Sequence, residues 1–203
     1  MNKKQIMNSL KKMAGHFEDK SLNDSIKVVE KFIKEYELTN KSESSSALSL
    51  PNSKHDIFLY TDGACRGNPG PGSWACLSQI KDDEILFQSS GVDFNTTNNK
   101  MEMTAVVEGL NRIKESTKCM NVAVYTDSKY IVDGMKSWVS GWKKRGWKKA
   151  DKKEPENLVL WKELDSLNDY FENLEFNWVK GHNGHPQNEL CDQLCNKALD
   201  EVI

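Results

Sequence analysis

The chain has 203 residues, with 28 basic and 30 acidic side chains and a formal net charge of −2. This length accommodates one main domain of about 150 residues and a small extension, and the near balance of charge argues against a partner held by bulk electrostatic attraction. The longest uncharged stretch, residues 67–80, is too short to span a membrane, and no apolar signal region follows the first residues. The five cysteines lack a dense framework and predict reduced thiols, so we expect a cytoplasmic protein.

The first 54 residues predict an extension followed by a linker. Apolar residues such as Ile6, Leu10 and Met13 recur at helical spacing in two stretches of residues 1–39, so we expect two short amphipathic helices there. Residues 40–54 contain six Ser and one Pro and predict a flexible linker. The extension would dock on the following domain, bind a protein partner or associate with another copy of itself, and its pattern does not choose among these roles.

The domain at residues 55–203 opens with a buried strand, Ile57-Phe58-Leu59-Tyr60. We expect the turn signal Asp62-Gly63 to close this strand, which places Asp62 at its end. Residues 67–72 read Gly-Asn-Pro-Gly-Pro-Gly, but they lack the Gly-Lys-Ser/Thr ending of a P-loop and precede a strand-like segment. They therefore predict a turn between two β-strands.

A long helical pattern begins at Asn98. Met101, Ala105 and Leu110 share one face of this pattern, which leaves Glu102 in its first turn or two. Glu102 thus sits near the beginning of a helix that has an apolar face to bury.

Two more acids occupy comparable places later in the chain. Residues 122–126 form a second apolar strand pattern, and Asp127 follows it where a helix could begin. Residues 175–179 predict a further strand, and Asp192 lies beyond it in a C-terminal helical pattern. The apolar stripe of that last helix is predicted to be Leu190, Leu194 and Ala198.

These elements predict an α/β domain, and we expect a central mixed sheet of five strands, three of them antiparallel and in the first half. Neighbouring strand ends in such a sheet, with helices packed on its faces, can bring Asp62, Glu102, Asp127 and Asp192 together. Carboxylates packed closely repel one another and are normally held by a bound divalent cation. Taken singly, each acid is equally well explained as a turn residue, a helix cap or a solvated side chain, so the prediction rests on their joint context.

The most basic stretch of the chain runs from Lys136 to Lys153. It holds seven Lys and one Arg against a single acid, Asp151, with Trp138, Trp142 and Trp147 interleaved. A local basic patch of this kind is typical of contact with a phosphate backbone. Tryptophans at this spacing are as often packing residues as stacking platforms, so both interpretations stay open.

Two interpretations compete for the histidines near the C-terminus. His182 lies in Gly181-His182-Asn183-Gly184, where the glycines permit loop motion and the imidazole could move protons near neutral pH. Alternatively, His182, His185, Cys191 and Cys195 could form a structural zinc site, although the cysteine pair suits core packing equally well.

The joint context of these motifs resembles type 1 ribonuclease H, the bacterial-type enzyme that cuts the RNA strand of an RNA–DNA hybrid. The resemblance covers about residues 55–200. Six blocks carry it in one order: Tyr60-Thr61-Asp62-Gly63, Gly67-Asn68-Pro69-Gly70-Pro71-Gly72, Thr96-Thr97-Asn98-Asn99-Lys100-Met101-Glu102, Tyr125-Thr126-Asp127-Ser128, Trp142-Lys143-Lys144-Arg145-Gly146-Trp147 and Val179-Lys180-Gly181-His182-Asn183-Gly184-His185-Pro186.

The resemblance implies a metal-dependent hydrolysis of phosphodiesters, which leaves 5′-phosphate and 3′-hydroxyl ends. Two Mg²⁺ ions ~4 Å apart would activate water and stabilise the leaving oxygen, and Mn²⁺ could substitute. By the same likeness Asp62 bridges both ions, Glu102 and Asp127 hold one of them, and Asp192 completes the other site. His182 would be the mobile-loop histidine that assists catalysis.

The resemblance also implies the contacts with an RNA–DNA hybrid. The basic stretch would be a protruding handle on the DNA strand, with Trp142, Lys143, Lys144, Arg145 and Trp147 as its contacts. Asn68, Thr97, Asn98 and Asn99 would touch the hybrid elsewhere, although Asn and Thr before a helix also serve as caps. Selectivity would come from the 2′-hydroxyls of one strand and the deoxyribose shape of the other.

Two other functions are compatible with parts of this pattern. A recombinase of the same fold would use a similar acid cluster for strand transfer, but the His182 loop and the basic stretch argue against it. A catalytically silent hybrid-binding module would keep the basic patch and need no acids. We therefore expect a monomeric catalytic domain that cleaves hybrids and has no membrane partner.

Overall fold

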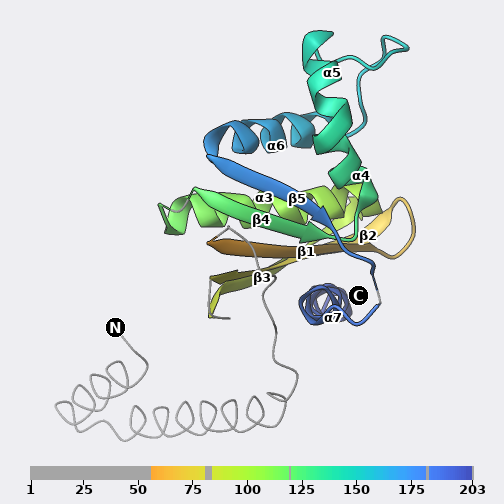
Figure 1. Cartoon of the computed structure of the whole chain (residues 1–203). Coiled ribbons are helices and arrows are strands. Elements are labelled where there is room, and N and C mark those ends of the chain that lie inside the picture. Colours follow the sequence, from red (N-terminus) through yellow and green to blue (C-terminus); the bar gives the residue numbers. More distant parts are fainter. Residues whose placement is uncertain (1–55, 81–83, 119, 182, 203) are drawn as a thin grey trace, which may run out of the picture. The chain divides into compact units, whose positions relative to one another are not determined.

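The computed structural model describes residues 56–80, 84–118, 120–181 and 183–202, all of which belong to one compact unit (Figure 1). The predictions for residues 1–39, for residues 40–54 and for His182 concern positions outside this set. Within the described part of the chain, none of the helices combines the length and the apolar character needed to cross a membrane.

A five-stranded mixed sheet forms the centre of the domain, as predicted. Its order is β3-β2-β1-β4-β5, in which β1, β2 and β3 are antiparallel neighbours and β4 and β5 run parallel to β1. The strands are β1 (Ile57–Cys65), β2 (Gly70–Ile80), β3 (Ile85–Thr96), β4 (Asn121–Thr126) and β5 (Asn173–Trp178).

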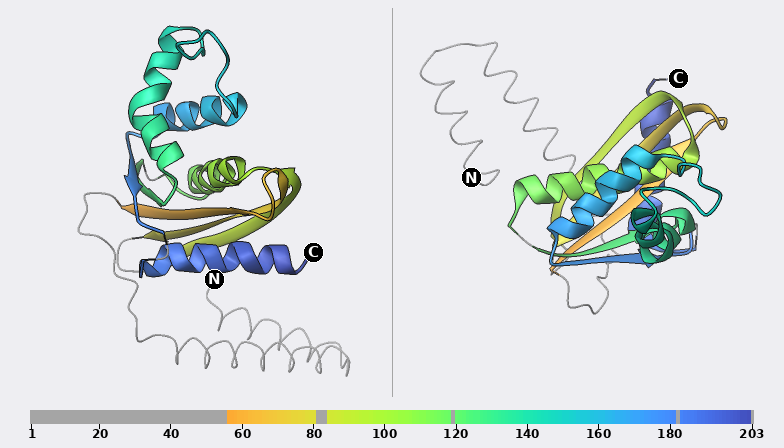
Figure 2. Two further views of the ribbon diagram at one scale, coloured as in Figure 1. Left: turned by 90° about the vertical axis from the view of Figure 1, so that its right-hand side faces the viewer. Right: turned by 90° about the horizontal axis from the view of Figure 1, so that it is seen from above.

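Helices cover both faces of this sheet. Helix α3 packs on one face with α6 beyond it, and α7 lies along the opposite face (Figure 2). Helices α4, η1 and α5 follow one another closely and lead away from the sheet (Figure 1). The helices are α3 (Asn98–Ser116), α4 (Lys129–Asp133), the π-helical η1 (Gly134–Trp138), α5 (Val139–Lys144), α6 (Leu158–Tyr170) and α7 (Pro186–Asp200).

Strand β1 builds both hydrophobic cores because its side chains alternate between the two faces of the sheet. Ile57 and Leu59 join the larger core under α3 and α6. Phe58 and Tyr60 join the smaller core under α7. The short apolar run that the sequence shows is therefore a central strand buried on both sides.

The Asp62-Gly63 pair does not end β1, and the predicted turn at this point is wrong. The strand continues to Cys65 because β2 keeps pairing with it, through Gly63 opposite Trp74 and Cys65 opposite Gly72. The parallel pairing with β4, in contrast, stops at Thr61 opposite Thr126. Asp62 consequently lies inside a strand but just beyond the end of its parallel neighbour.

The buried face of α7 also differs from the predicted stripe. Leu190, Leu194 and Ala198 are only half-buried, whereas Cys191, Cys195 and Leu199 are fully buried. The predicted stripe is thus displaced by one residue along the helix. The small thiols fit against the main chain of β1, where Cys191 Sγ lies 3.4 Å from Tyr60 O, and the larger leucines pack at the sides of the contact.

Two glycines bring α3 unusually close to β1. A Cβ atom on Gly63 would lie 2.6 Å from the carbonyl carbon of Met101 and 2.8 Å from Cα of Glu102. Farther along the helix, a Cβ atom on Gly109 would lie 2.6 Å from Cδ1 of Leu59. Real Cβ atoms do not approach other atoms this closely, so Gly63 is required for the helix backbone to lie on the strand, whereas a methyl group at position 109 would have to displace the end of the Leu59 side chain.

We predict that Gly63→Ala destabilises the domain by more than about 2 kcal/mol, because the added methyl group meets helix backbone that has no room to move. The measurement is urea unfolding of the full chain in EDTA. Gly141→Ala is the matched control, since its Cβ would meet only the flexible guanidinium of Arg145 at 3.2 Å and alanine favours a helix. Equal midpoints for Gly63→Ala and the unaltered protein would contradict the close-packing argument.

Candidate active site

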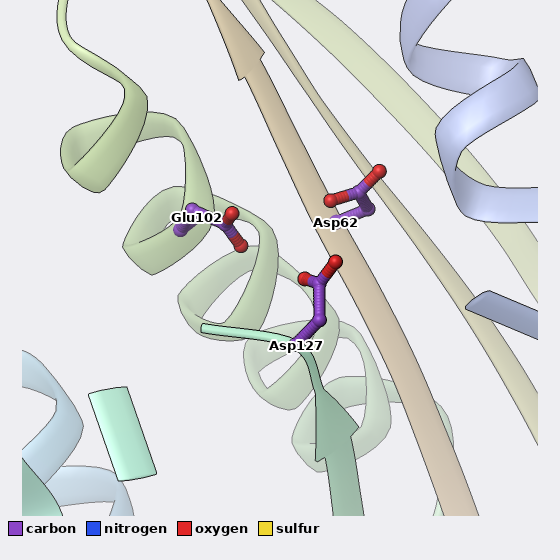
Figure 3. Close-up of side chains that lie close together, drawn as sticks. All are labelled: Asp62, Glu102 and Asp127. Atoms are coloured by element: carbon purple, nitrogen blue, oxygen red, sulfur yellow. The ribbon is translucent and has the colours of Figure 1, made fainter. Parts of the chain in front are cut away.

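Three of the four predicted acids come together at one point of the structure. Asp62 lies on β1, Glu102 in the second turn of α3, and Asp127 directly after β4. One carboxylate oxygen of each residue lies within 4.8 Å of the others, and the three side chains point toward one another (Figure 3). Elements far apart in the sequence thus supply one cluster of negative charge.

Burial and mutual repulsion make this cluster costly to ionise. Asp62 is 7% exposed and Glu102 is 6% exposed. Burial, followed by the charges of Asp127 and Asp192, raises the pKa of Asp62 to about 7, while a main-chain hydrogen bond partly opposes the rise. Burial, with Asp62 and Asp127, raises the pKa of Glu102 well above its usual range.

The hydrogen bonds of the cluster leave oxygen atoms that suit a metal ion. The main-chain N–H of Gly63 donates to Asp62 Oδ1 at 2.9 Å, and Asn98 Nδ2 donates to Glu102 Oε1 at 3.4 Å. Glu102 Oε2 is buried, and none of the described residues provides it with a hydrogen-bond donor. Three carboxylates with such an oxygen are the donor set that Mg²⁺ and similar hard cations prefer, so the residues fit the predicted ion.

Asp192 lies outside the group of three, on the half-buried side of α7. Its charge nevertheless reaches Asp62, because it contributes to the raised pKa of that residue. Asn196 Nδ2 donates to both Asp192 O and Asp192 Oδ1, each at 3.0 Å. The structure therefore places the fourth predicted acid at the edge of the cluster, held by its own helix.

The loop that carries His182 begins against the acid cluster. A Cβ atom on Gly181 would collide with Asp127 Oδ2 and would lie 3.2 Å from Asp127 Cγ, so the main chain packs directly on this carboxylate. His182 itself is outside the described residues. Glycine is needed at position 181 because a side chain there would displace Asp127, one of the three acids.

The remaining residues of the alternative zinc site have other contacts. Cys191 and Cys195 are fully buried, with their thiols 3.4 Å from the carbonyl oxygens of Tyr60 and Asp62. His185 is half-buried and packs on Tyr60, with ring centroids 5.5 Å apart. Across the described ranges, the one group of His, Cys, Asp and Glu side chains that could hold a metal is the carboxylate cluster. These contacts favour the packing interpretation of the cysteine pair.

A polar surface lies beside the acids. The main-chain N–H of Asn98 donates to Asn68 Oδ1 at 3.3 Å, which joins the β1–β2 turn to the beginning of α3. Thr97 Oγ1 accepts from Lys100 N at 3.3 Å, so Thr97 is the cap that the sequence allowed. Asn99 is exposed on the same turn. Four of the nine residues predicted to touch nucleic acid, Asn68, Thr97, Asn98 and Asn99, are thus connected at the beginning of α3, the helix that carries Glu102.

A family model for RNase H matches residues 54–200. The chain belongs to the RNase H family. The Ribonuclease H of Cupriavidus necator is 47% identical to it over 148 residues, which cover 72% of this chain and 97% of that protein. This similarity confirms the resemblance found in the sequence motifs and identifies the chain as a ribonuclease H enzyme.

Solved RNase H structures have the same fold. LC9-RNase H1, a type 1 RNase H with the type 2 active-site motif, is 32% identical with a TM-score of 0.64, and the match covers 76% of each chain. LC11-RNase H1 in complex with an RNA/DNA hybrid is 28% identical with a TM-score of 0.57, and the match covers 72% of this chain and 98% of that one. The five-stranded architecture is thus that of the RNase H family.

In this RNase H the basic stretch spans the end of η1, all of α5 and the loop after it. Lys144 and Arg145 are exposed and form no ion pair with any residue that the structure describes. Lys143, in contrast, pairs with Asp165 at 2.8 Å and with Asp169 at 3.4 Å, both on α6. The positive charges of neighbouring residues are therefore not equivalent, because α6 already neutralises that of Lys143.

The tryptophans of this stretch divide between packing and exposure. Trp142 is 8% exposed and packs edge-on against Trp161, with ring centroids 5.5 Å apart, so most of its surface is used in packing. Trp147 is half-buried, and Lys162 Nζ lies 5.7 Å from its ring centroid. The packing interpretation thus holds for Trp142.

A pocket of about 590 Å³ opens between η1, α5 and the basic loop. Tyr130, Trp138 and Trp142 contribute aromatic surface to it, and Arg145 and Lys149 contribute positive charge. Sequence reasoning did not single out Tyr130 or Lys149. The sequence does contain a pattern that indicates Tyr130: it lies eight residues before Trp138 and so continues the four-residue helical spacing of Trp138 and Trp142.

We predict that Asp62→Asn stabilises the metal-free protein at neutral pH by roughly 1–3 kcal/mol. The pKa of Asp62 is raised by folding, so the folded state holds its proton more tightly and the unaltered protein loses stability as pH rises from about 4 to about 7. The variant lacks this loss, and its advantage should vanish toward pH 4. Urea unfolding in EDTA at pH 4, 5.5 and 7.5 measures it, with Asp133→Asn as an exposed control. A pH-independent difference would contradict the prediction.

Proposed function

We propose that this protein cleaves the RNA strand of RNA–DNA hybrids as an endonuclease, by two-metal-ion catalysis that leaves 5′-phosphate and 3′-hydroxyl ends. The observation that carries the proposal is the buried cluster of Asp62, Glu102 and Asp127 in a chain of the RNase H family. The crystal structure of LC11-RNase H1 with an RNA/DNA hybrid supports the choice of substrate.

Asp62, Glu102, Asp127 and Asp192 are the proposed ligands of Mg²⁺, with Mn²⁺ as a substitute. Divalent cations bound there would supply an activated water and stabilise the charge on the leaving oxygen. The raised pKa of Asp62 and the buried Oε2 of Glu102 support this role, because none of the described residues supplies these carboxylates with the positive charge that normally accompanies buried acids. The charges of both Asp127 and Asp192 act on Asp62, which supports the proposal that Asp62 is the ligand shared by the two ions.

His182 is the proposed group that transfers protons during the reaction. It follows Gly181, whose main chain packs on the carboxylate of Asp127, and this adjacency in the chain supports the assignment. An imidazole titrates near neutral pH and can therefore accept and return a proton in the working range of the enzyme.

The hybrid is proposed to lie across the two surfaces beside the acids. Asn68, Thr97, Asn98 and Asn99 would face its sugar and phosphate groups next to the cluster. Lys144, Arg145 and Trp147 would contact the DNA strand, whereas Trp142 supports them from the core and Lys143 keeps its pairing with α6. Contacts to 2′-hydroxyls on one strand and to deoxyribose on the other would give selectivity for hybrids without base-specific readout.

Three further expectations from the sequence stay predictions: a cytoplasmic location, a monomeric catalytic domain and a partner for residues 1–39.

The proposal is tested by cleavage of a duplex whose RNA strand carries the label. We expect cutting of the hybrid in Mg²⁺ and none in EDTA, with double-stranded RNA and DNA left intact. Asp62→Asn should lower the rate more than about 100-fold because it removes a ligand shared by both proposed ions, while Asp133→Asn at an exposed site should keep full activity.

End-group analysis completes this experiment. The upstream fragment should be extended by a polymerase that needs a 3′-hydroxyl, and the downstream fragment should be degraded by an exonuclease that needs a 5′-phosphate. Binding of the hybrid without cleavage in either Mg²⁺ or Mn²⁺ would instead support a silent hybrid-binding module and refute the proposal.

We predict that Lys144→Ala and Arg145→Ala each weaken hybrid binding. Each should also make the fall of the logarithm of the binding constant with the logarithm of the salt concentration shallower, by about 0.9 in slope, as expected when one phosphate contact is lost. Lys143→Ala is the matched control, because α6 already neutralises its charge, and it should leave the slope nearly unchanged. Hybrid affinity measured between 50 and 200 mM salt tests both expectations. Equal slopes for all three variants would contradict the inference that Lys143, unlike Lys144 and Arg145, makes no phosphate contact.

A further inference from the structure

Helix α7 lies on β1, and cysteines four residues apart in the helix contact carbonyl groups two residues apart in the strand. Cys191 Sγ lies 3.4 Å from Tyr60 O, and Cys195 Sγ lies 3.4 Å from Asp62 O. Four residues of an α-helix rise about 6.0 Å and two residues of a strand span about 6.6 Å, so both thiols meet equivalent carbonyl groups. The helix therefore runs in the same direction as β1, and the two cysteines set its register against the strand.

The second of these thiol contacts is reinforced from β2. Ser73 Oγ donates to the carbonyl oxygen of Cys195 at 2.9 Å, and Ser73 is fully buried. Cys195 of α7 thus contacts β2 through its carbonyl group and β1 through its side chain. The strand residue at this point is Asp62, so the attachment lies at the main chain of the central acid of the cluster.

Asp192 occupies the helical turn between the two thiol contacts. Its height along the sheet is therefore fixed by the same attachments. Its carboxylate is also restrained, because Asn196, one turn later, donates to Asp192 Oδ1 at 3.0 Å. Asn196 is exposed and Ser73 is buried, so one restraint acts at the surface of the domain and the other in its interior.

We propose that Ser73, Cys195 and Asn196 are positioning residues that hold Asp192 ready against Asp62. This inference rests on the proposed function, in which Asp192 is a metal ligand. Ser73 and Cys195 fix where α7 lies, and Asn196 fixes how the carboxylate is turned. The fourth ligand would then be preset by the fold, so that little ordering of the side chain remains when the ion binds.

The test compares Ser73→Ala and Asn196→Ala in the full chain by calorimetric titration with Mn²⁺ in the absence of nucleic acid. We expect each substitution to raise the Kd for the ion about 10-fold. The Mg²⁺ concentration for half-maximal hybrid cleavage should rise in parallel, whereas KM for the hybrid at saturating Mg²⁺ should not change. In an Asp192→Ala background neither substitution should alter the Kd further, because the residue that they position is absent.

Gln79→Met is the matched control. Gln187 Nε2 donates to Gln79 Oε1 at 3.3 Å, so this variant also removes a buried hydrogen bond between β2 and α7, but at the opposite end of the helix. It should lose stability and keep the affinity for Mn²⁺. If Ser73→Ala folds poorly, Asn196→Ala still decides the matter, because its side chain is exposed and its fold can be verified by circular dichroism.

Unchanged affinity for Mn²⁺ in Asn196→Ala, or an equal loss in Gln79→Met, would overturn the inference. So would an Asp192→Ala variant that binds Mn²⁺ as the unaltered protein does. Failure of the proposed function is distinguishable, since it would show as absent hybrid cleavage by the unaltered protein, while the titration reports on Asp192 without any substrate.

Discussion

The close approach of α3 to β1 at Gly63 is the constraint on which the active site depends. Glycine lets the helix backbone at Met101 and Glu102 rest directly on the strand, and farther along the helix Gly109 packs against the side chain of Leu59. Glu102 can reach Asp62 only because no side chain separates the two backbones, so packing of main chain against main chain creates the charged cluster.

This geometry places like charges where water cannot screen them. Asp62 and Glu102 are nearly buried, and their pKa values are raised chiefly because of that burial. Without a cation the fold must bear this repulsion, so the carboxylate cluster lowers the stability of the metal-free domain. The hydrophobic cores on both faces of β1 supply the stability that tolerates it.

Charge is segregated on the surface, although the chain as a whole is close to neutral. The acids gather where β1, α3 and β4 meet, while α4, η1 and α5 carry the exposed Lys144 and Arg145 away from the sheet (Figure 1). Within the basic region, Asp165 and Asp169 of α6 pair with Lys143. Local fields of opposite sign suit an enzyme that must hold metal at one place and a polyanion at another.

The sequence by itself determined the fold class and the elements that carry the four acids, and it offered Thr97 as a helix cap, because hydrophobic period and capping chemistry are local properties. Tertiary structure decided the rest. Asp62-Gly63 stays in a strand because β2 continues to pair with it, and α7 buries Cys191 and Cys195 because small thiols fit the main chain of β1. Trp142 became a core residue because Trp161 of α6 lies against it. In each case the deciding partner is remote in the chain, and a local pattern carries no information about it.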